Sequence, residues 1–398
     1  MITGDELNRA TLARQLLLRR EALPVTEAVR RLVALQAQEP ASPYLALWNR
    51  LTDFDLAGLD AALAERAVVK GTLLRVTLHA VHAGDYAVFR EAMEPTLRAS
   101  RLGDPRFRAS GLTAADADAL VSELLVQAGQ PRTSAELAAW LEARLGTPLD
   151  PAAWRMLRQY APLLHTPGSG PWSFAGHKHT FVAPAGDCRP ALDRQDAAAI
   201  ALPVLIQRYL AAYGPASVAD MAQFAMVQRA RAKTAVQTLG DALDRIDGPD
   251  GAVLYDVPGA PRPAGDTPAP PRLLGMWDSV LLAYHDRSRV IPPGLRKHVI
   301  RINGDVLPVL LVDGYVAGVW RMTGGQVEAT AFQPLAEQAW DGLAAEAGPL
   351  LALTADRDPA LYSRFGHWWK KLPDGERRLL PGSTARTDEF RTEGPSVG

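Results

Sequence analysis

The sequence predicts an α+β protein in which three tandem winged-helix units precede a C-terminal antiparallel β-rich domain. Two observations predict this fold class. Apolar residues recur at helical spacing in successive groups, and each group ends in a short run that is typical of a β-hairpin. From residue 273 onward, β-rich runs separated by glycine turns predominate. The expected units span 1–97, 111–190, 196–260 and 273–385, with a disordered tail at 386–398.

The first unit is expected to combine helices with a strand hairpin. Its predicted helices lie at 5–20, 23–35 and 63–68. The run TLLRVTLHAV (72–81) alternates as a strand would, which places Arg75, Thr77 and His79 on one face. A polar face on an apolar strand could line a cleft. A hydrogen-bonded core histidine is the competing interpretation of His79.

The second and third units repeat this plan. A basic segment, RASRLGDPRFR (98–108), is expected to link the first unit to the second. The predicted helices of the second unit lie at 112–129, 133–146 and 150–163, and its hairpin lies at 163–176. In the third unit the helices lie at 204–214, 216–225 and 231–243, and the hairpin lies at 245–257. Thr133 or Ser134 with Glu136 forms a capping signal. A hairpin after each helix triplet is the best evidence for internal repetition.

The remainder of the chain changes character. Residues 258–272 are rich in proline and glycine and predict a linker or an extended loop. The run at 306–332 contains two turn signals, Asp313-Gly314 and Gly324-Gly325, between β-rich stretches. These signals predict an antiparallel meander. A helix at 334–353 is expected to pack on it.

Composition limits the function classes. The formal net charge of −1 argues against a uniformly basic nucleic-acid coat, although local patches can still contact phosphate. The single cysteine, Cys188, excludes an intrachain disulfide and favours a reducing compartment. No stretch approaches the roughly 18 apolar residues that a membrane helix needs. We therefore expect a cytoplasmic protein without a membrane partner.

The most informative short motif is Gln36-Ala37-Gln38. Residues two apart on an α-helix point about 200° away from each other, so both amides can face one site only if the chain is extended there. Pro40 disfavours the helical conformation at Glu39, which supports an extended segment after Leu35. The alternative is that the two glutamines only cap a helix or lie in solvent.

A metal site is not expected. His177 and His179 with Cys188 are the best candidate ligands, but the set is incomplete and its spacing fits no standard zinc pattern. No cofactor is expected either.

Basic clusters with aromatic neighbours suit phosphate contact and base stacking. One cluster lies at 284–301, a second at 98–108, and a third pairs Lys370 and Lys371 with Trp368 and Trp369. The predicted DNA-binding residues are Arg98, Arg101, Arg287, Arg289, Arg296, Lys297 and Arg301. Solvated surface charges are the alternative for any single cluster, but three clusters in a winged-helix array favour nucleic acid.

Four segments together resemble the bacterial winged-helix DNA glycosylase family of AlkZ and its YcaQ-like relatives. They are LNRATLARQLLLRR, VRRLVALQAQEPASPYLALWNRL, VVKGTLLRVTLHAVHAGDY and LLGMWDSVLLAYHDRSRVI. The most specific element is the Gln-x-Gln motif, matched by Gln36 and Gln38, where the YcaQ-like branch has Gln-x-Asp. The resemblance implies that these glutamines are catalytic, that a monomer binds double-stranded DNA in a concave basic cleft, and that alkylated purines are excised. For the Gln-x-Gln branch it also implies unhooking of interstrand crosslinks and self-resistance to a natural-product genotoxin.

The chemistry of a cationic lesion explains why two neutral amides suffice. A neutral base usually needs protonation by a general acid before it can leave, whereas an N7-alkylated purine already carries a positive charge. Two carboxamides can then position a water and face the developing sugar cation. We therefore expect activity on cationic lesions.

Three alternatives remain from the sequence. A non-catalytic winged-helix transcription regulator would use the same fold without chemistry, and a drug-sequestration protein would bind the genotoxin itself. Glu39 could act as a general base, although its position next to the motif points it away from both glutamines in an extended chain.

Overall fold

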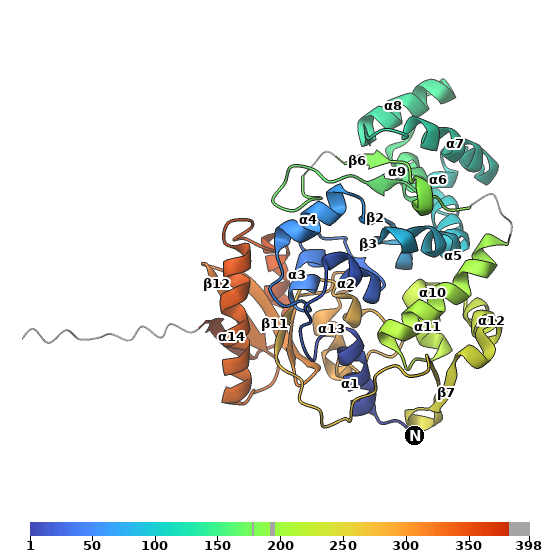
Figure 1. Ribbon diagram of the computed structural model, residues 1–398. Coiled ribbons are helices and arrows are strands. Elements are labelled where there is room, and N and C mark those ends of the chain that lie inside the picture. The colour runs from blue at the N-terminus through green and yellow to red at the C-terminus, as the bar shows by residue number, and fades with distance from the viewer. Residues whose placement is uncertain (177–178, 192–195, 382–398) are drawn as a thin grey trace, which may run out of the picture.

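A computed structural model describes residues 1–176, 179–191 and 196–381 of the chain (Figure 1). The predicted tail at 386–398 and His177 lie outside these residues. The mixed α and β class with a C-terminal antiparallel sheet is confirmed. Among the helices of the described ranges, none has both the length and the apolar composition of a membrane span.

The first unit contains more elements than its sequence predicts. In chain order they are α1 (Gly4–Arg14), α2 (Val25–Arg31), β1 (Leu35–Gln36), α3 (Ser42–Trp48), α4 (Leu56–Ala64), β2 (Val68–Thr72) and β3 (Leu78–His82). The predicted helix at 63–68 is wrong, because α4 ends at Ala64 and Val68 already pairs with His82 in the hairpin. Helix α3 was not predicted. Its Pro43 lies in the first turn, where a helix tolerates proline.

The predicted strand at 72–81 is also wrong in its first half. Leu74–Val76 forms a 3-10 turn that separates β2 from β3. Arg75 and Val76 have φ values of 52° and 57°, in the left-handed region that residues other than glycine rarely adopt. The tip of this hairpin is therefore a strained turn and not a regular strand.

The second unit begins with a long helix. Its elements are α5 (Ala83–Leu102), α6 (Pro105–Arg108), α7 (Ala114–Gln127), β4 (Arg132–Thr133), α8 (Ser134–Leu145), α9 (Pro151–Tyr160), β5 (Leu164–His165), β6 (Thr180–Val182) and a 3-10 turn at Gly186–Cys188. The basic segment 98–108 is not a linker, because α5 continues past residue 97 and α6 follows it. Buried Phe89, Met93 and Leu97 explain the length of α5. The capping box of Thr133 and Glu136 is confirmed.

The wing of the second unit differs from the predicted hairpin at 163–176. Strand β5 pairs with β6, which begins only at Thr180. Trp172 instead packs on Tyr44 of the first unit, with ring centroids 4.9 Å apart, so the segment after β5 crosses between the two units. The two units share one six-stranded sheet with the order β1-β3-β2-β5-β6-β4.

The third unit matches its prediction closely. Its elements are α10 (Ala197–Tyr213), α11 (Val218–Ala225), α12 (Arg229–Leu239), 3-10 turns at Gly240–Ala242 and Pro249–Gly251, and the hairpin of β7 (Asp244–Asp247) and β8 (Val253–Asp256). Ala216, just before α11, pairs with Tyr255 of the hairpin. Strand β4 pairs with β6 and β1 with β3 in the same manner. Gln36 thus lies on the short extended segment that precedes the last two helices of each repeat.

The C-terminal domain is a five-stranded antiparallel sheet with the order β13-β12-β11-β10-β9. Its elements are β9 (Arg272–Leu274), 3-10 turns at Ser279–Leu281 and Pro293–Leu295, α13 (Arg296–Val299), β10 (Val309–Val312), β11 (Tyr315–Thr323), β12 (Gln326–Ala331), α14 (Glu337–Thr354), a 3-10 helix at Ser363–Lys371 and β13 (Glu376–Leu380). The predicted meander and both glycine turns are confirmed, with Asp313, Gly314, Gly324 and Gly325 at positive φ. Helix α14 lies along this sheet (Figure 1).

Hydrophobic packing joins the units into two cores. One core combines Tyr44 of the first unit with Trp320 and Trp340 of the C-terminal domain. The other combines the hairpin and α5 with the second and third units, including Phe181 and Tyr209. The predicted residue boundaries of the units therefore do not coincide with the boundaries of the cores.

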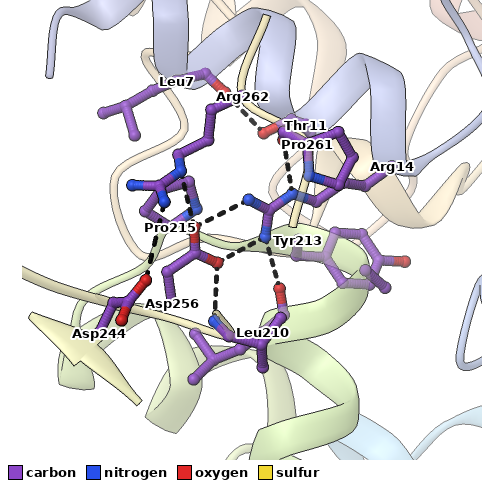
Figure 2. Close-up of polar contacts among 12 residues, drawn as sticks. Leu7, Thr11, Arg14, Leu210, Tyr213, Pro215, Asp244, Asp256, Pro261 and Arg262 are labelled. Atoms are coloured by element: carbon purple, nitrogen blue, oxygen red, sulfur yellow. Dashed lines mark hydrogen bonds and ion pairs between the residues drawn. The ribbon is translucent and has the colours of Figure 1, made fainter. Parts of the chain in front are cut away.

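The proline-rich segment 258–271 is an extended loop that runs along α1. Arg9 donates to the carbonyl of Thr267 at 2.6 Å, and Arg14 Nε donates to that of Pro261 at 3.1 Å. Arg14 also forms a two-pronged ion pair with Asp256 of β8, with N–O distances of 2.6 and 2.8 Å (Figure 2). Both side chains are almost fully buried. This pair ties the third unit to the N-terminal helix.

Candidate active site

Gln36 is held by hydrogen bonds from the strained turn of the hairpin. Only 5% of Gln36 is exposed. Arg75 Nη2 donates to Gln36 Oε1 at 2.6 Å, and Gln36 Nε2 donates to Thr77 Oγ1 at 3.3 Å. Arg75 Nη1 also donates to the carbonyl of Phe224 in α11 at 3.3 Å. The Gln36 amide therefore has one fixed orientation, set from two elements.

His79 completes this network as a neutral base. It pairs with Gln36 across β1 and β3 and is completely buried. Its Nε2 accepts from Arg75 Nη2 at 3.0 Å, which leaves Nδ1 to donate to the Thr77 carbonyl at 3.1 Å. Burial and then the Arg75 charge hold the pKa of His79 well below its usual value. The neutral imidazole thus holds the Arg75 guanidinium beside Gln36.

The turn that carries Arg75 needs support because its backbone is strained. Residues held at such φ values cost on the order of 1–3 kcal/mol each. Arg101 donates from Nη2 to the carbonyl of Val76 at 2.7 Å, and Leu73 N donates to Thr77 O at 3.0 Å. Burial lowers the pKa of Arg75 to about 10, so its guanidinium stays charged at neutral pH. The turn thus presents a fixed cation to Gln36.

Gln38 differs from Gln36 in its surroundings. It is exposed, and the chain bends at this residue after the extended Leu35–Gln36 segment. Gln38 Oε1 accepts a long hydrogen bond of 3.5 Å from Leu78 N. The two amides are therefore bound to the adjacent residues Thr77 and Leu78 at the start of β3. The extended backbone expected for the motif is confirmed up to Gln36, but the two side chains have unequal access to solvent.

A cavity of about 610 Å³ opens beside Gln38. In the sheet register, Gln36 lies in one row with His79 and Gly71. Lys70 lies in the next row, with Ala80 and Leu35. Because neighbouring rows point to opposite faces of a sheet, Lys70 and Gln36 project from opposite faces. The cavity lies on the Lys70 side and is lined by Gln38 but not by Gln36. Its other walls come from the second unit and the C-terminal domain, including Arg158, His165, Phe174, Phe181 and Arg364.

Glu39 also lines this cavity but is already paired. It forms an ion pair with Arg364, whose side chain reaches it from the C-terminal domain. Burial raises the pKa of Glu39, and the Arg364 charge opposes this rise. The alternative assignment of Glu39 as general base would require this ion pair to open.

The sequence interpretation missed most of the cavity residues. Lys70 carried the only usable signal, because it is a charged residue inside the apolar run VVKGT. His165 belonged to a predicted strand, and no local pattern marked Arg158. Arg364 is distant in sequence and only the folded chain brings it to Glu39.

Three of the predicted DNA-binding arginines are engaged within the protein. Arg289 is buried, donates to the carbonyl of Pro215 at 2.9 Å and stacks 4.0 Å from the Tyr284 ring centroid. Arg98 forms an ion pair with Asp118, and Arg101 supports the strained turn. These contacts favour structural roles and do not support the predicted phosphate contacts.

The other predicted basic residues lie closer to solvent. Arg296 and Lys297 are exposed on α13. Arg287 is half-buried. Burial and then the Arg296 charge lower the pKa of Arg287. The charge of Arg287 in turn contributes to lowering the pKa of Arg75. Arg287 and Arg296 therefore extend the positive charge of Arg75 toward the surface. Arg301 stacks 4.5 Å from the Trp368 ring centroid.

The expectation that Trp368 and Trp369 stack on bases is wrong. Both side chains are buried in the core. Trp368 Nε1 donates to Asp305 Oδ2 at 2.8 Å, which anchors the loop at 301–305. Among the described residues, no group of three or more His, Cys, Asp or Glu side chains is arranged to hold a metal ion.

Comparison with known proteins gives consistent matches. The family described as DNA glycosylase AlkZ-like matches residues 29–353. A curated protein of Streptomyces sahachiroi, the interstrand DNA cross-link repair glycosylase, is 28% identical over 338 residues, which cover 80% of this chain and 88% of that protein. The solved structure of Streptomyces sahachiroi DNA glycosylase AlkZ has the same fold, with a TM-score of 0.74 at 23% identity. The match covers 89% of this chain and 97% of that one.

Proposed function

Because this chain belongs to the AlkZ-like family of DNA glycosylases, we propose that it hydrolyses the N-glycosidic bond of cationic N7-alkylated purines in double-stranded DNA. Gln36 and Gln38 are the proposed catalytic residues. The observation that carries the proposal is the fixed Gln36 amide, held by Arg75 and Thr77, next to the exposed Gln38.

The unequal burial of the two amides suggests separate roles. Gln38 is exposed at the mouth of the cavity and can contact the lesion or the attacking water. Gln36 Oε1 accepts one hydrogen bond from Arg75, and a carboxamide oxygen can accept a second from water. A water held between the two amides would attack the sugar carbon as the charged purine leaves. The positive charge of the lesion removes the need for a general acid.

Crosslinked DNA is a proposed substrate. The curated relative that matches this chain is named for interstrand cross-link repair. A base that is joined to the opposite strand cannot be flipped fully into a closed pocket. A crosslinked base therefore needs catalytic groups that it can reach without full flipping, and the exposed Gln38 is such a group. We further propose that the natural role is self-resistance to an alkylating natural product, exercised by a cytoplasmic monomer.

A substrate panel tests the proposed reaction. We expect the purified chain to release N7-methylguanine from duplex DNA and to leave uracil and hypoxanthine in place, because only the first base is cationic. Released bases are identified by chromatography and mass spectrometry. A duplex with an N7-alkylguanine crosslink of the azinomycin type, analysed by the same methods, tests whether the enzyme separates the two strands. Release of uracil would show that the enzyme itself activates a neutral leaving base, and the proposed chemistry would be wrong.

The proposed DNA-contacting surface lies around α13 and the loop at 301–305. Trp277 Nε1 donates to the carbonyl of Gly304 at 3.0 Å, and Asp305 is held by Trp368. Ile302, two residues before the anchored Gly304, is fully exposed. A firmly held loop with an exposed apolar tip suits insertion into the minor groove, while Arg296 and Lys297 bind phosphates.

The double variant Arg296→Glu, Lys297→Glu tests this surface. Each lost phosphate contact removes about 0.9 from the slope of log affinity against log salt, so we expect weaker duplex binding and a slope shallower by about 1.8. Fluorescence anisotropy at several salt concentrations measures both. The control is Arg19→Glu, Arg377→Glu, which changes the net charge equally at two exposed residues. Equal affinity and slope in the two double variants would place the DNA elsewhere.

A further inference from the structure

Lys70 is a buried amine that the proposed excision step does not use. It lies in the middle of β2, and only 3% of the residue is exposed. Its Nζ lies 4.4 Å from the centroid of the Phe174 ring, and both residues line the cavity beside Gln38. Among the described residues it forms no hydrogen bond and no ion pair. The nearby carboxylate of Glu39 is paired with Arg364.

These surroundings make the Lys70 amine nucleophilic. Burial lowers its pKa to about 7, and the charge of Glu39 opposes this shift only in part. A large share of the side chain is therefore neutral at physiological pH, and a neutral desolvated amine attacks carbonyl carbons. The ring of Phe174 offsets only part of the cost of burying a charged lysine, which favours the neutral amine.

A neutral base lies next to this amine. His165 pairs with Lys70 across β2 and β5 and lines the same cavity. Burial and then the Lys70 charge hold the pKa of His165 well below its usual value, so the imidazole is unprotonated at neutral pH. The groups that face the cavity thus include a nucleophile, a base and Gln38.

We propose that Lys70 confers a second activity, cleavage of abasic DNA by a lyase reaction. The inference deepens the proposed function, since base excision at Gln38 would leave an abasic sugar at the mouth of the cavity that contains Lys70. The aldehyde form of that sugar is the substrate. The activity itself does not depend on which base was removed.

The reaction balances without a cofactor. The neutral Lys70 amine adds to C1′ of the open-chain sugar, and a proton from the solvent lets the C1′ hydroxyl leave as water, which gives a protonated imine. His165 takes a proton from C2′, and the electron pair expels the 3′ phosphate by breaking the C3′–O bond. Hydrolysis of the imine then returns Lys70 and leaves an unsaturated aldehyde on the strand. No group is oxidised or reduced in the net reaction.

Borohydride trapping on ready-made abasic DNA tests the proposal. The full chain is incubated with a duplex that contains one abasic site, prepared with a separate enzyme, in the presence of sodium borohydride. Reduction of the imine by hydride converts it to a stable amine, so we expect a covalent protein–DNA complex on a denaturing gel. Peptide mapping should locate the adduct on Lys70. In parallel reactions without borohydride, strands should break without alkali.

Matched variants decide whether Lys70 is responsible. Lys70→Met and Lys70→Arg should both lose the trapped complex, and Lys70→Arg does so with the positive charge retained. Lys233→Met, at an exposed lysine of α12, should form the complex like the parent. Thermal unfolding verifies that each variant is folded.

Two outcomes would overturn the proposal. They are a parent protein that forms no complex, and a complex that forms equally in the Lys70 variants. Because the abasic site is supplied directly, failure of base excision would leave this result unaffected. Base excision without trapping would remove the lyase and leave the glycosylase proposal intact.

Discussion

Gln36→Ala is expected to slow base excision by about 10²–10³-fold, the loss seen when one fixed polar group that stabilises a transition state is removed. The reason is that the Gln36 amide is oriented before substrate binds, through Arg75 and Thr77. Because the same network fixes the amide, Arg75→Met should cause much of the same loss although Arg75 need not touch DNA. Single-turnover rates on N7-methylguanine duplex measure the chemical step.

The control for Arg75 separates positioning from charge. Arg75→Lys keeps the cation but cannot donate to Gln36, His79 and the Phe224 carbonyl in the same geometry. A positioning role predicts a large loss in the single-turnover rate for both Arg75 variants with little change in duplex affinity. Full activity in Arg75→Met, with a folded protein, would show that the Gln36 network is only structural.

Asp256→Ala is expected to lower the free energy of unfolding by about 3–5 kcal/mol, because it leaves Arg14 as an unpaired buried charge. Arg14 also donates to the carbonyls of Leu210 and Pro261, so the ion pair connects α1, α10 and the extended loop (Figure 2). Urea unfolding followed by fluorescence and circular dichroism gives the change, provided that the two probes coincide.

A neighbouring pair supplies the control. Arg262 Nη2 lies 3.7 Å from Asp244 Oδ2, and at least a third of each side chain is exposed. Asp244→Ala should therefore cost less than about 1 kcal/mol. The double variant Arg14→Met, Asp256→Leu removes both buried charges and should recover much of the loss. Equal unfolding midpoints for Asp256→Ala and the parent would mean that the buried pair does not hold the units together.

The sequence predicted the parts of the fold that depend on local signals. The third unit and the C-terminal meander were predicted closely, because their helices are amphipathic and their turns carry glycines at positive φ. The hairpin of the second unit was misplaced, because Trp172 packs in a core formed mainly by other units. Helix α3 was missed because all its residues are buried, which removes helical periodicity.

The candidate site was only partly predictable, because its residues come from different units and meet only in the folded chain. Strand alternation placed Arg75, Thr77 and His79 on one face, and all three side chains contact Gln36 or one another. The alternation was wrong at Arg75, because a strained turn brings this residue to Gln36 and His79. Arg289 was assigned to DNA from its local charge, yet its partners Pro215 and Tyr284 bury it. Pairing across units is not visible in a local pattern.

The most direct test of the central claim compares the parent with the double variant Gln36→Ala, Gln38→Ala on N7-methylguanine duplex and on an azinomycin-type crosslinked duplex. Free base and alkali-labile breaks are both measured, and Glu39→Gln serves as the control at the adjacent acid. We expect the parent and Glu39→Gln to release base and the double variant to release none above the uncatalysed rate. Base release by the double variant at the rate of the parent, or its loss in Glu39→Gln alone, would contradict catalysis by the amide pair.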